Sequence, residues 1–262
     1  PYYGYVIGSM TDLQAATMDD VKQFYHNYYA PSNATLVVLG DFDRQSTVEK
    51  IADYFGTLSY RAKPQTKPIV TTPITKERVE VVKEPVALSR ISMSWLSPKI
   101  YTSGDAKCDI LAFILGIGKS SRLYQRLVYQ LQIAKDISVR QESLELTSIF
   151  TIRVTAHSGV AVEHLKAEID KVLEEIIAQP PTAEEVTKAK NILLTSHISS
   201  LQRIGTRANT LNRYNHYTKD PGFIDDDFNR YVTITPEHVQ QMAKELLTKD
   251  SRAVVITQPE KQ

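Results

Sequence analysis

The chain carries six histidines, and their spacing decides whether it can hold a catalytic metal. A catalytic zinc helix places two ligating histidines three or four residues apart on one face, as in H-x-x-E-H. No two histidines of this chain have that spacing, and Ser158-Gly159 between the two nearest indicates a strand end before a helix begins. The sequence therefore predicts no metal site and no cofactor in this chain. The histidines are His26, His157, His164, His197, His216 and His238.

Other catalytic motifs are incomplete. Gly118-Lys119-Ser120 resembles the end of a phosphate-binding loop, but Phe113 stands where that loop requires its first glycine. No G-x-S-x-G nucleophile elbow occurs. The single cysteine, Cys108, lies in an apolar run, where we expect the thiol to pack as a small hydrophobic residue. The residues alone predict no complete active site.

The nearly equal numbers of basic and acidic residues argue against one class of partner, nucleic acid. The chain has 31 basic and 30 acidic residues and a net charge of +1, so it has no electrostatic footprint for nucleic acid. No apolar stretch approaches the roughly 20 residues that span a bilayer. We therefore expect neither a nucleic-acid partner nor a membrane span.

Two stretches of the chain are copies of one helix–strand unit, 218 residues apart. Residues 17–24 align with residues 235–242, and residues 36–38 align with residues 254–256. A repeat at the spacing of a domain indicates a duplicated module. We therefore expect residues 1–58 to be the C-terminal part of a preceding domain. Residues 59–75, rich in proline and lysine, are expected to be a linker, and residues 76–258 a complete second domain.

Alternating strands and amphipathic helices predict an α+β fold with two layers. Its sheet is expected to be mixed and largely antiparallel, with helices packed on one face. The strands are predicted at residues 35–39, 90–95, 150–155 and 252–257, and the helices at 17–29, 48–55, 105–115, 121–131, 162–177, 182–202 and from 235 onward. The other face of the sheet must meet water or a partner. It carries Arg90, Ser92, Ser94, Thr151, Arg153 and Thr155.

Three of these segments carry a family likeness. Residues 11–43 closely resemble the end of the first domain of the pitrilysin/insulinase family of zinc peptidases, which includes the mitochondrial processing peptidases. Residues 118–128, together with Asp136-Ile-Ser-Val139, look like the second domain of that family. Residues 208–214, with Asp220-Pro-Gly222, look like its bacterial members.

The resemblance implies a clamshell of duplicated α+β domains that encloses unfolded peptides. The family binds zinc through an H-x-x-E-H helix and a distant glutamate, which lie before the matching segment, so zinc would come from upstream residues of a parent protein. A glycine-rich loop that contacts substrate in some members corresponds to Gly116, Gly118 and Lys119. An Arg/Tyr pair that holds the substrate has no clean match, although Arg153 lies on a suitable strand.

Two functions follow from the resemblance. The first is a non-catalytic portion of a bacterial zinc metalloendopeptidase, inactive by itself, with an upstream peptidase domain and a peptide substrate as partners. The alternative is a structural or assembly subunit of the same fold with no peptidase activity. The likeness leaves a homo- or heterodimer open, and it favours the bacterial periplasm or cell envelope over the cytoplasm.

Overall fold

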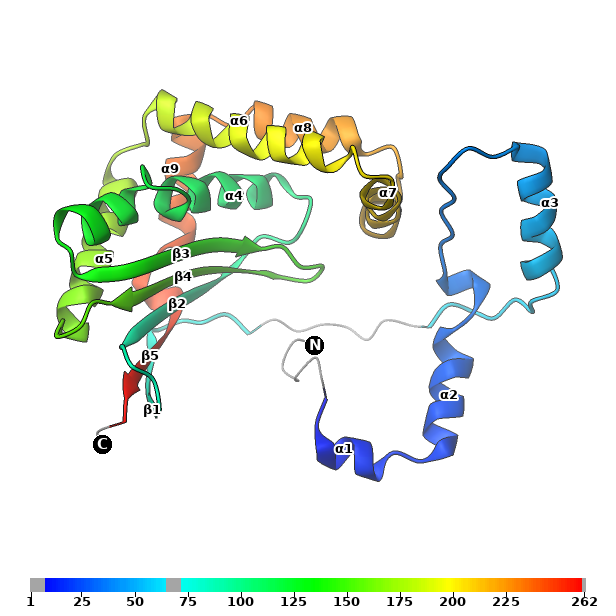
Figure 1. Cartoon of the computed structure of the whole chain (residues 1–262), viewed down its shortest axis with the longest axis horizontal. Coiled ribbons are helices and arrows are strands. Elements are labelled where there is room, and N and C mark those ends of the chain that lie inside the picture. The colour runs from blue at the N-terminus through cyan, green and yellow to red at the C-terminus, as the bar shows by residue number, and fades with distance from the viewer. Residues whose placement is uncertain (1–7, 65–71, 261–262) are drawn as a thin grey trace.

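The computed structural model describes residues 8–64 and 72–260 and shows a five-stranded sheet with helices stacked on one face (Figure 1). Parts of the predicted first domain and linker, at residues 1–7 and 65–71, lie outside the described residues. The elements are α1 (Met10–Ala15), α2 (Met18–Tyr28), η1 (Pro31–Asn33), α3 (Arg44–Phe55), β1 (Arg78–Glu84), β2 (Arg90–Ser97), α4 (Ser103–Gly116), η2 (Tyr124–Gln130), β3 (Ala134–Glu142), β4 (Ser148–Ala156), α5 (Val162–Ala178), α6 (Ala183–Ser200), α7 (Ile204–Thr218), α8 (Ile224–Val232), α9 (Pro236–Leu246), η3 (Lys249–Ser251) and β5 (Arg252–Pro259).

The sheet has the strand order β1-β5-β2-β4-β3. The β1–β5 pair is parallel, and the other three pairs are antiparallel. This arrangement confirms the predicted mixed, largely antiparallel sheet and the α+β class. The two edge strands, β1 and β3, were not predicted from the sequence.

The hydrophobic core lies between the sheet and the helices that cover it. On β2, Ile91, Met93 and Trp95 are each at most 1% exposed and point toward the helices. Most of α4 is buried as well, including Cys108, whose thiol packs in the core as expected. Each large apolar side chain removed from water in this way contributes about 1.5–3 kcal/mol.

Helix α6 begins where the sequence predicted, at a capping box. The Thr182 hydroxyl accepts from the Glu185 N–H at 3.1 Å, and the Glu185 carboxylate accepts from the Thr182 N–H at 2.8 Å. Arg122 donates two further bonds of 2.8 Å to the same carboxylate. The cap therefore also ties α6 to the turn that precedes η2.

The predicted helix at residues 121–131 is wound differently from an α-helix. Within it η2 is a π-helix, and the Arg126 carbonyl accepts from the Leu131 N–H at 3.0 Å, five residues further on. The wider turn ends at Gln132, which takes a left-handed φ of 53° and leads into β3. The predicted helix is therefore present, and over residues 124–130 it is wound as a π-helix.

The two copies of the repeat fold alike but are buried differently. Thr17 caps α2 and Thr235 caps α9, each through a capping box. Val239 on α9 is 0% exposed, whereas Val21, at the same position of the repeat, is 57% exposed. In the first copy the helix has formed although no sheet of the described residues covers it.

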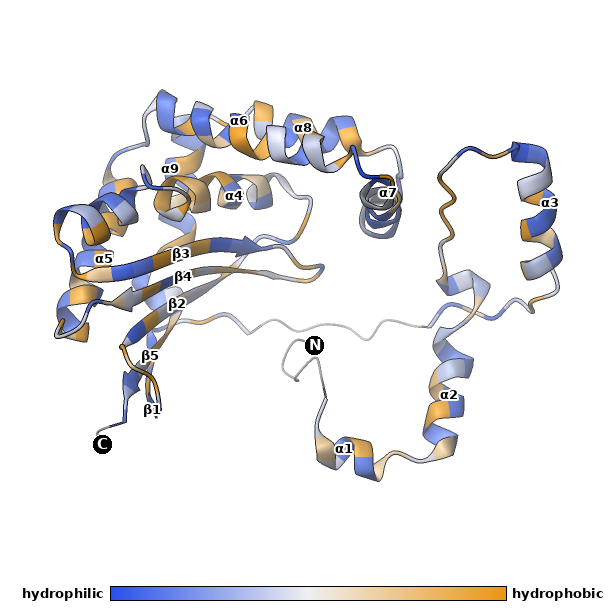
Figure 2. Ribbon diagram, in the orientation of Figure 1, coloured by the Kyte–Doolittle hydropathy of each residue, from blue (hydrophilic) through white to orange (hydrophobic). Residues whose placement is uncertain are grey.

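The predicted strand at residues 35–39 is not a strand in the structure. Its counterpart in the second copy is β5, which lies between β1 and β2. Residues 35–39 have no neighbouring strand in the described part of the chain, so they pair in no sheet. The helices of this part of the chain are not packed either, because α1, α2 and α3 contain no buried residue. Figure 2 shows hydrophobic residues on these helices, which lie apart from the sheet.

A buried ion pair joins three elements of the sheet module. Arg252, at the start of β5, is 1% exposed and lies 2.6 Å from Asp170 on α5 and 2.6 Å from Glu77 just before β1. Burial alone would raise the pKa of Asp170, but the hydrogen bonds and charge of Arg252 lower it below its ordinary value. The ion pair thus holds α5 against the ends of two strands.

We expect Asp170→Asn to lower the free energy of unfolding by about 3 kcal/mol, because it leaves the Arg252 guanidinium buried with one carboxylate instead of two. Urea unfolding followed by circular dichroism measures this loss. The matched control is Glu174→Gln, which breaks the ion pair of Glu174 with Lys249 on the surface and should change stability by less than about 1 kcal/mol. Equal effects of the two variants would contradict the prediction.

Candidate functional site

The open face of the sheet carries side chains in rungs that cross all five strands. The central rung, from β1 to β3, is Glu80, Val255, Ser92, Arg153 and Ser138. The neighbouring rung is Arg78, Ala253, Ser94, Thr151 and Arg140. Serine, threonine and arginine dominate this face, as the alternation in β2 and β4 predicted.

Hydrogen bonds link these polar side chains across the strands. Arg90 Nε donates to Thr155 Oγ1 at 3.3 Å, and Thr155 Oγ1 donates in turn to Asp136 at 3.1 Å. The Ser94 and Thr151 hydroxyls lie 3.1 Å apart. The face is therefore an ordered polar surface, on which hydroxyl and guanidinium groups are held in place by one another.

The four residues that the resemblance suggested as substrate contacts do not come together. Arg153 lies on the open face of β4. Gly116 ends α4 and packs on Val139, which pairs with Ile152 on the face covered by helices. The loop that holds Gly118 and Lys119 thus lies on the opposite side of the sheet from Arg153. Their contact with substrate stays a prediction.

Gly116 has a structural reason to be glycine. A Cβ atom at this position would stand 2.2 Å from Cγ2 of Val139, so only glycine lets the end of α4 lie this close to β3. Gly118 differs, because it adopts a φ of 81° with no atom within 4 Å of its would-be Cβ. The carbonyl of Lys119 accepts from Gln125 Nε2 at 2.6 Å, which fixes the loop against η2.

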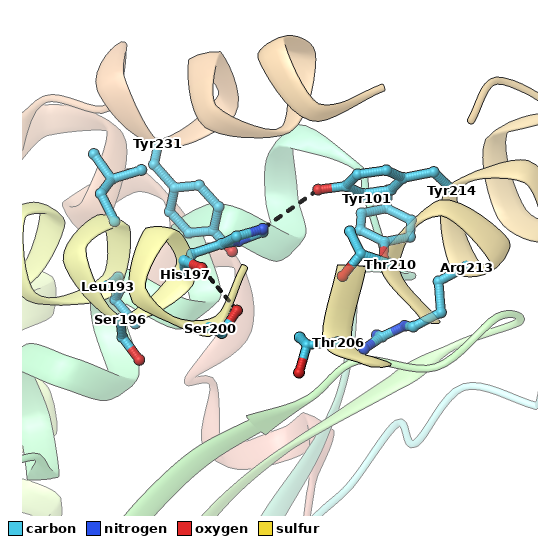
Figure 3. Close-up of a pocket in the computed structure, with 11 residues that line it drawn as sticks. Tyr101, Leu193, Ser196, His197, Ser200, Thr206, Thr210, Arg213, Tyr214 and Tyr231 are labelled. Atoms are coloured by element: carbon cyan, nitrogen blue, oxygen red, sulfur yellow. Dashed lines mark hydrogen bonds between the residues drawn. The ribbon is translucent and has the colours of Figure 1, made fainter. Parts of the chain in front are cut away.

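A polar cavity that the sequence analysis missed lies where α6, α7 and α8 meet the loop after β2 (Figure 3). Its volume is about 320 Å³. Tyr101, in the loop, takes a left-handed φ of 62°, and its N–H donates to Asp105 at 3.0 Å. The cavity is lined by Tyr101, Leu193, Leu194, Ser196, His197, Ser200, Thr206, Thr210, Arg213, Tyr214 and Tyr231.

Buried ionic groups support one side of this cavity. The Tyr214 hydroxyl donates to Asp227 at 2.7 Å, and Asp227 forms an ion pair with Arg230. Arg230 also donates to the Thr102 carbonyl at 2.8 Å and lies 3.4 Å from Asp105. Burial raises the pKa of Tyr214, and the bond to Asp227 raises it further, so the hydroxyl stays protonated and acts as a donor.

The cavity is not arranged for nucleophilic catalysis. Ser200 Oγ donates to the backbone carbonyl of His197 at 2.7 Å rather than to its ring (Figure 3). His197 Nε2 instead lies 3.5 Å from the Tyr214 hydroxyl. A serine nucleophile requires an imidazole within hydrogen-bond reach of its own oxygen. These groups can bind and orient, and their geometry offers no attacking atom.

Part of this cluster was visible in the sequence. Asp227 and Arg230 are three residues apart, the spacing of neighbours on one helix face. Their partners Tyr101, Thr102 and Asp105 come from more than 100 residues earlier, and spacing cannot reveal a contact over that distance.

The described residues fit neither a metal centre nor a membrane helix. Among residues 8–64 and 72–260, no three histidine, cysteine, aspartate or glutamate side chains are grouped so that they could hold a metal ion. The zinc that the resemblance implies therefore has no set of ligands in this part of the chain. Within the same ranges, no helix combines the length and the apolar character that crossing a bilayer demands.

Comparison with known families settles the classification. Residues 15–193, more than half of the chain, match the model of the peptidase M16 inactive domain. The chain belongs to the peptidase M16 family. This confirms the resemblance to the pitrilysin/insulinase peptidases and makes the chain a non-catalytic part of a peptidase-family protein. The division into residues 1–58, 59–75 and 76–258 stays a prediction.

Relatives and solved structures agree with this classification. Zinc protease PqqE from Helicobacter pylori is 31% identical over 209 residues, which are 77% of this chain and 46% of that protein. A protease structure from Helicobacter pylori superposes with a TM-score of 0.85 at 26% identity, covering 97% of this chain and 61% of the other. The first half of the periplasmic protease PqqL from Escherichia coli shares the fold, with a TM-score of 0.78 at 17% identity over 96% of this chain and 56% of that one. The M16 chain thus spans about half the length of the curated relatives that it matches.

We expect Gly116→Ala to destabilise the M16 chain by about 1–3 kcal/mol, because the new methyl group overlaps Val139. Adding Val139→Ala should recover part of that loss, which denaturant unfolding of both single variants and the double variant will show. In Gly118→Ala the strain is in the backbone, so Val139→Ala should give no recovery there. Purely additive effects of Gly116→Ala and Val139→Ala would contradict the packing argument.

A second prediction concerns Asp109, which accepts from the Tyr231 hydroxyl at 2.6 Å. Burial raises its pKa from 3.8 to about 7. Between pH 3.8 and pH 7 the folded state therefore keeps a proton that the unfolded state has released. The free energy of unfolding falls as the pH rises through this range, and this contribution is lost once the pH has passed 7.

Asp109→Asn should abolish that contribution. We expect the stability of the wild type, relative to the variant, to fall by about 3 kcal/mol between pH 4.5 and pH 8. Urea unfolding of both proteins at the two pH values measures the difference. Parallel pH dependences would show that the carboxyl group titrates normally.

Proposed function

We propose that this chain is the non-catalytic half of a zinc peptidase and that its open sheet face lines the chamber that holds an unfolded peptide. The observation that carries the proposal is the polar face of the sheet, which no helix of the described residues covers (Figure 1). Its hydroxyl and guanidinium groups can bond to the backbone and side chains of an extended chain. β1 and β3 stand at the ends of the strand order, where an extended peptide can add to the sheet.

In this proposal, the chemistry belongs to residues outside this chain. The relative PqqE is named a zinc protease. An upstream peptidase domain would supply the zinc ligands and the general base, and the present chain would bind and orient the peptide. The periplasm or cell envelope of a bacterium is the proposed location, in keeping with the periplasmic relative PqqL.

The upstream domain is also the proposed packing partner of α2 and α3. A largely apolar groove of about 760 Å³ runs between these helices and includes Tyr25, Tyr28, Leu36, Ile51 and Phe55. Phe24, beside the groove on α2, is 57% exposed. Contiguous exposed apolar surface is typical of an interaction site. A sheet of the upstream domain would cover this groove in the way that the five-stranded sheet of the present chain covers α9.

Peptide binding tests the chamber function. We expect a fluorescently labelled unfolded peptide to bind the chain without being cleaved, as measured by anisotropy and mass spectrometry. Ser138→Trp, on the open face, should weaken binding at least tenfold by blocking the rung that contains Arg153. The matched control is Ala167→Trp on the exposed side of α5, which should leave affinity unchanged. A chain that binds no peptide would fit the structural-subunit alternative instead.

The packing proposal predicts opposite outcomes for the same substitution in the two repeats. Val239→Glu should prevent folding or cost several kcal/mol, because it buries a charge in the core. Val21→Glu should leave the melting temperature of the chain unchanged and should reduce both its binding of a hydrophobic dye and its self-association. Calorimetry and analytical ultracentrifugation measure these effects. A large loss of stability in Val21→Glu would mean that α2 already packs within this chain.

A further inference from the structure

Two guanidinium groups stand next to each other on the open face without a carboxylate partner. Arg153 on β4 is directly opposite Ser138 on β3, and Arg140 is two residues beyond Ser138. Residues in this diagonal relation have Cα atoms about 7–8 Å apart, within reach of long side chains. Both arginines are exposed on a face that no described helix covers.

Their hydrogen-bond partners are neutral. Arg153 Nε donates to Ser92 Oγ at 3.4 Å, and Arg140 Nη2 donates to Ser138 Oγ at 3.2 Å. Within the described ranges, no carboxylate oxygen lies within 4.0 Å of either guanidinium. Four arginines of the module are paired with carboxylates: Arg122 with Glu185, Arg126 with Glu168, Arg230 with Asp227 and Asp105, and Arg252 with Asp170 and Glu77. Arg78 and Arg90, also on the open face, form no ion pair with the described carboxylates. Arg78 lies on the far edge strand, and Arg90, which is diagonal to Arg153 across β2 and β4, donates to Thr155.

Two acidic residues of the open face lie on β3 with Arg140, because Asp136 stands in the same diagonal relation to Arg153 and Glu142 is two residues beyond Arg140. Asp136 accepts from Thr155, which also holds Arg90. Glu142 pairs with Ile149 near the end of β3, and Glu80 lies on β1 at the far edge of the sheet. Arg140 and Arg153 are therefore two neighbouring guanidiniums that bond to hydroxyls and form no ion pair with the acidic residues beside them.

We propose that Arg140 and Arg153 form a carboxylate-binding site that makes the open face select acidic extended peptides. A guanidinium donates two parallel hydrogen bonds to a carboxylate, and two adjacent guanidiniums repel each other until an anion lies between them. The carboxylate is either an aspartate or glutamate side chain or the C-terminus of the peptide. This inference rests on the proposed peptide-binding role and adds a substrate class to it.

The spacing of the site suits an extended chain. Alternate residues of a strand project to the same side about 6.6–6.8 Å apart. One acidic side chain of a peptide lying along β3 and β4 can stand between the two guanidiniums, which belong to residues with Cα atoms about 7–8 Å apart. Its neighbouring side chains would then meet the hydroxyls of Ser92, Ser138 and Thr151.

Three labelled peptides of one unfolded sequence test the inference by fluorescence anisotropy with the full chain. One has a central glutamine and an amidated C-terminus, one has a central glutamate and an amidated C-terminus, and one has the glutamine and a free C-terminal carboxylate. We expect at least one carboxylate peptide to bind about tenfold more tightly than the neutral one. That preference should shrink as salt rises, because the site is exposed. The peptide that gains affinity identifies the source of the carboxylate.

The double variant Arg140→Gln/Arg153→Gln should remove the preference, so that the three peptides bind to it with affinities within about twofold of one another. The control is Arg78→Gln, which changes a charge of the same face four strands away, about 19 Å from Arg140. It should retain the preference. Equal binding of all three peptides, or a preference that survives the double variant, overturns this inference and leaves the chamber function standing. Binding of none of them overturns the chamber function and the inference together.

Discussion

An amphipathic helix followed by a strand is fully packed and paired only when a sheet accepts both, and this requirement explains how the two copies of the repeat differ. The strand needs neighbours for its backbone N–H and C=O groups, and the helix needs apolar surface against its buried side. In the second copy of the repeat, β5 lies between β1 and β2, and α9 packs into the core. In the first copy the same sequence pattern has neither, so residues 35–39 stay unpaired and Val21 stays exposed. The same helix–strand pattern is thus buried in the second copy and exposed in the first, according to whether a sheet lies beside it.

One face of the sheet forms the hydrophobic core, and the other is the proposed peptide-binding surface. On its covered face, α4, α5 and α9 bury the apolar side chains of β2 and β4, and Arg252 fixes α5 to the strand ends through Asp170. On its open face, hydroxyls and guanidiniums bond mainly to each other. Because side chains alternate along a strand, substitutions on the open face need not disturb the core. Substitutions on the open face can therefore alter the proposed peptide-binding surface while the fold is kept.

The sequence predicted the elements whose burial is one-sided. β2, β4, α5 and α6 were found because apolar residues recur at the period of a strand or helix and because Thr182 and Glu185 form a cap. β1 was not predicted because it is exposed on both faces at nearly every position. β3 was not predicted because a bulge between Ala134 and Asp136 interrupts the alternation of its side chains. Helix α7 buries Tyr214 alone, so it has no apolar stripe. Arg153 was a candidate contact because the family resemblance suggested an arginine and residue 153 lies on a predicted strand, whereas Arg140, on the unrecognised β3, was not a candidate. The cavity beside Tyr101 joins segments too distant in sequence for any spacing rule to connect.

The position of β5 in the sheet has a consequence for biosynthesis. The last strand of the module is inserted between β1 and β2, which precede it by more than 150 residues. While the chain is being made, β1 has no neighbour, and the growing polypeptide cannot complete its sheet until residue 259 has left the ribosome. Until then, the edge of β2 and the apolar side of α4 are open to wrong pairing. Long-range strand pairing of this kind is slow, and it leaves apolar surface exposed until the last strand is in place.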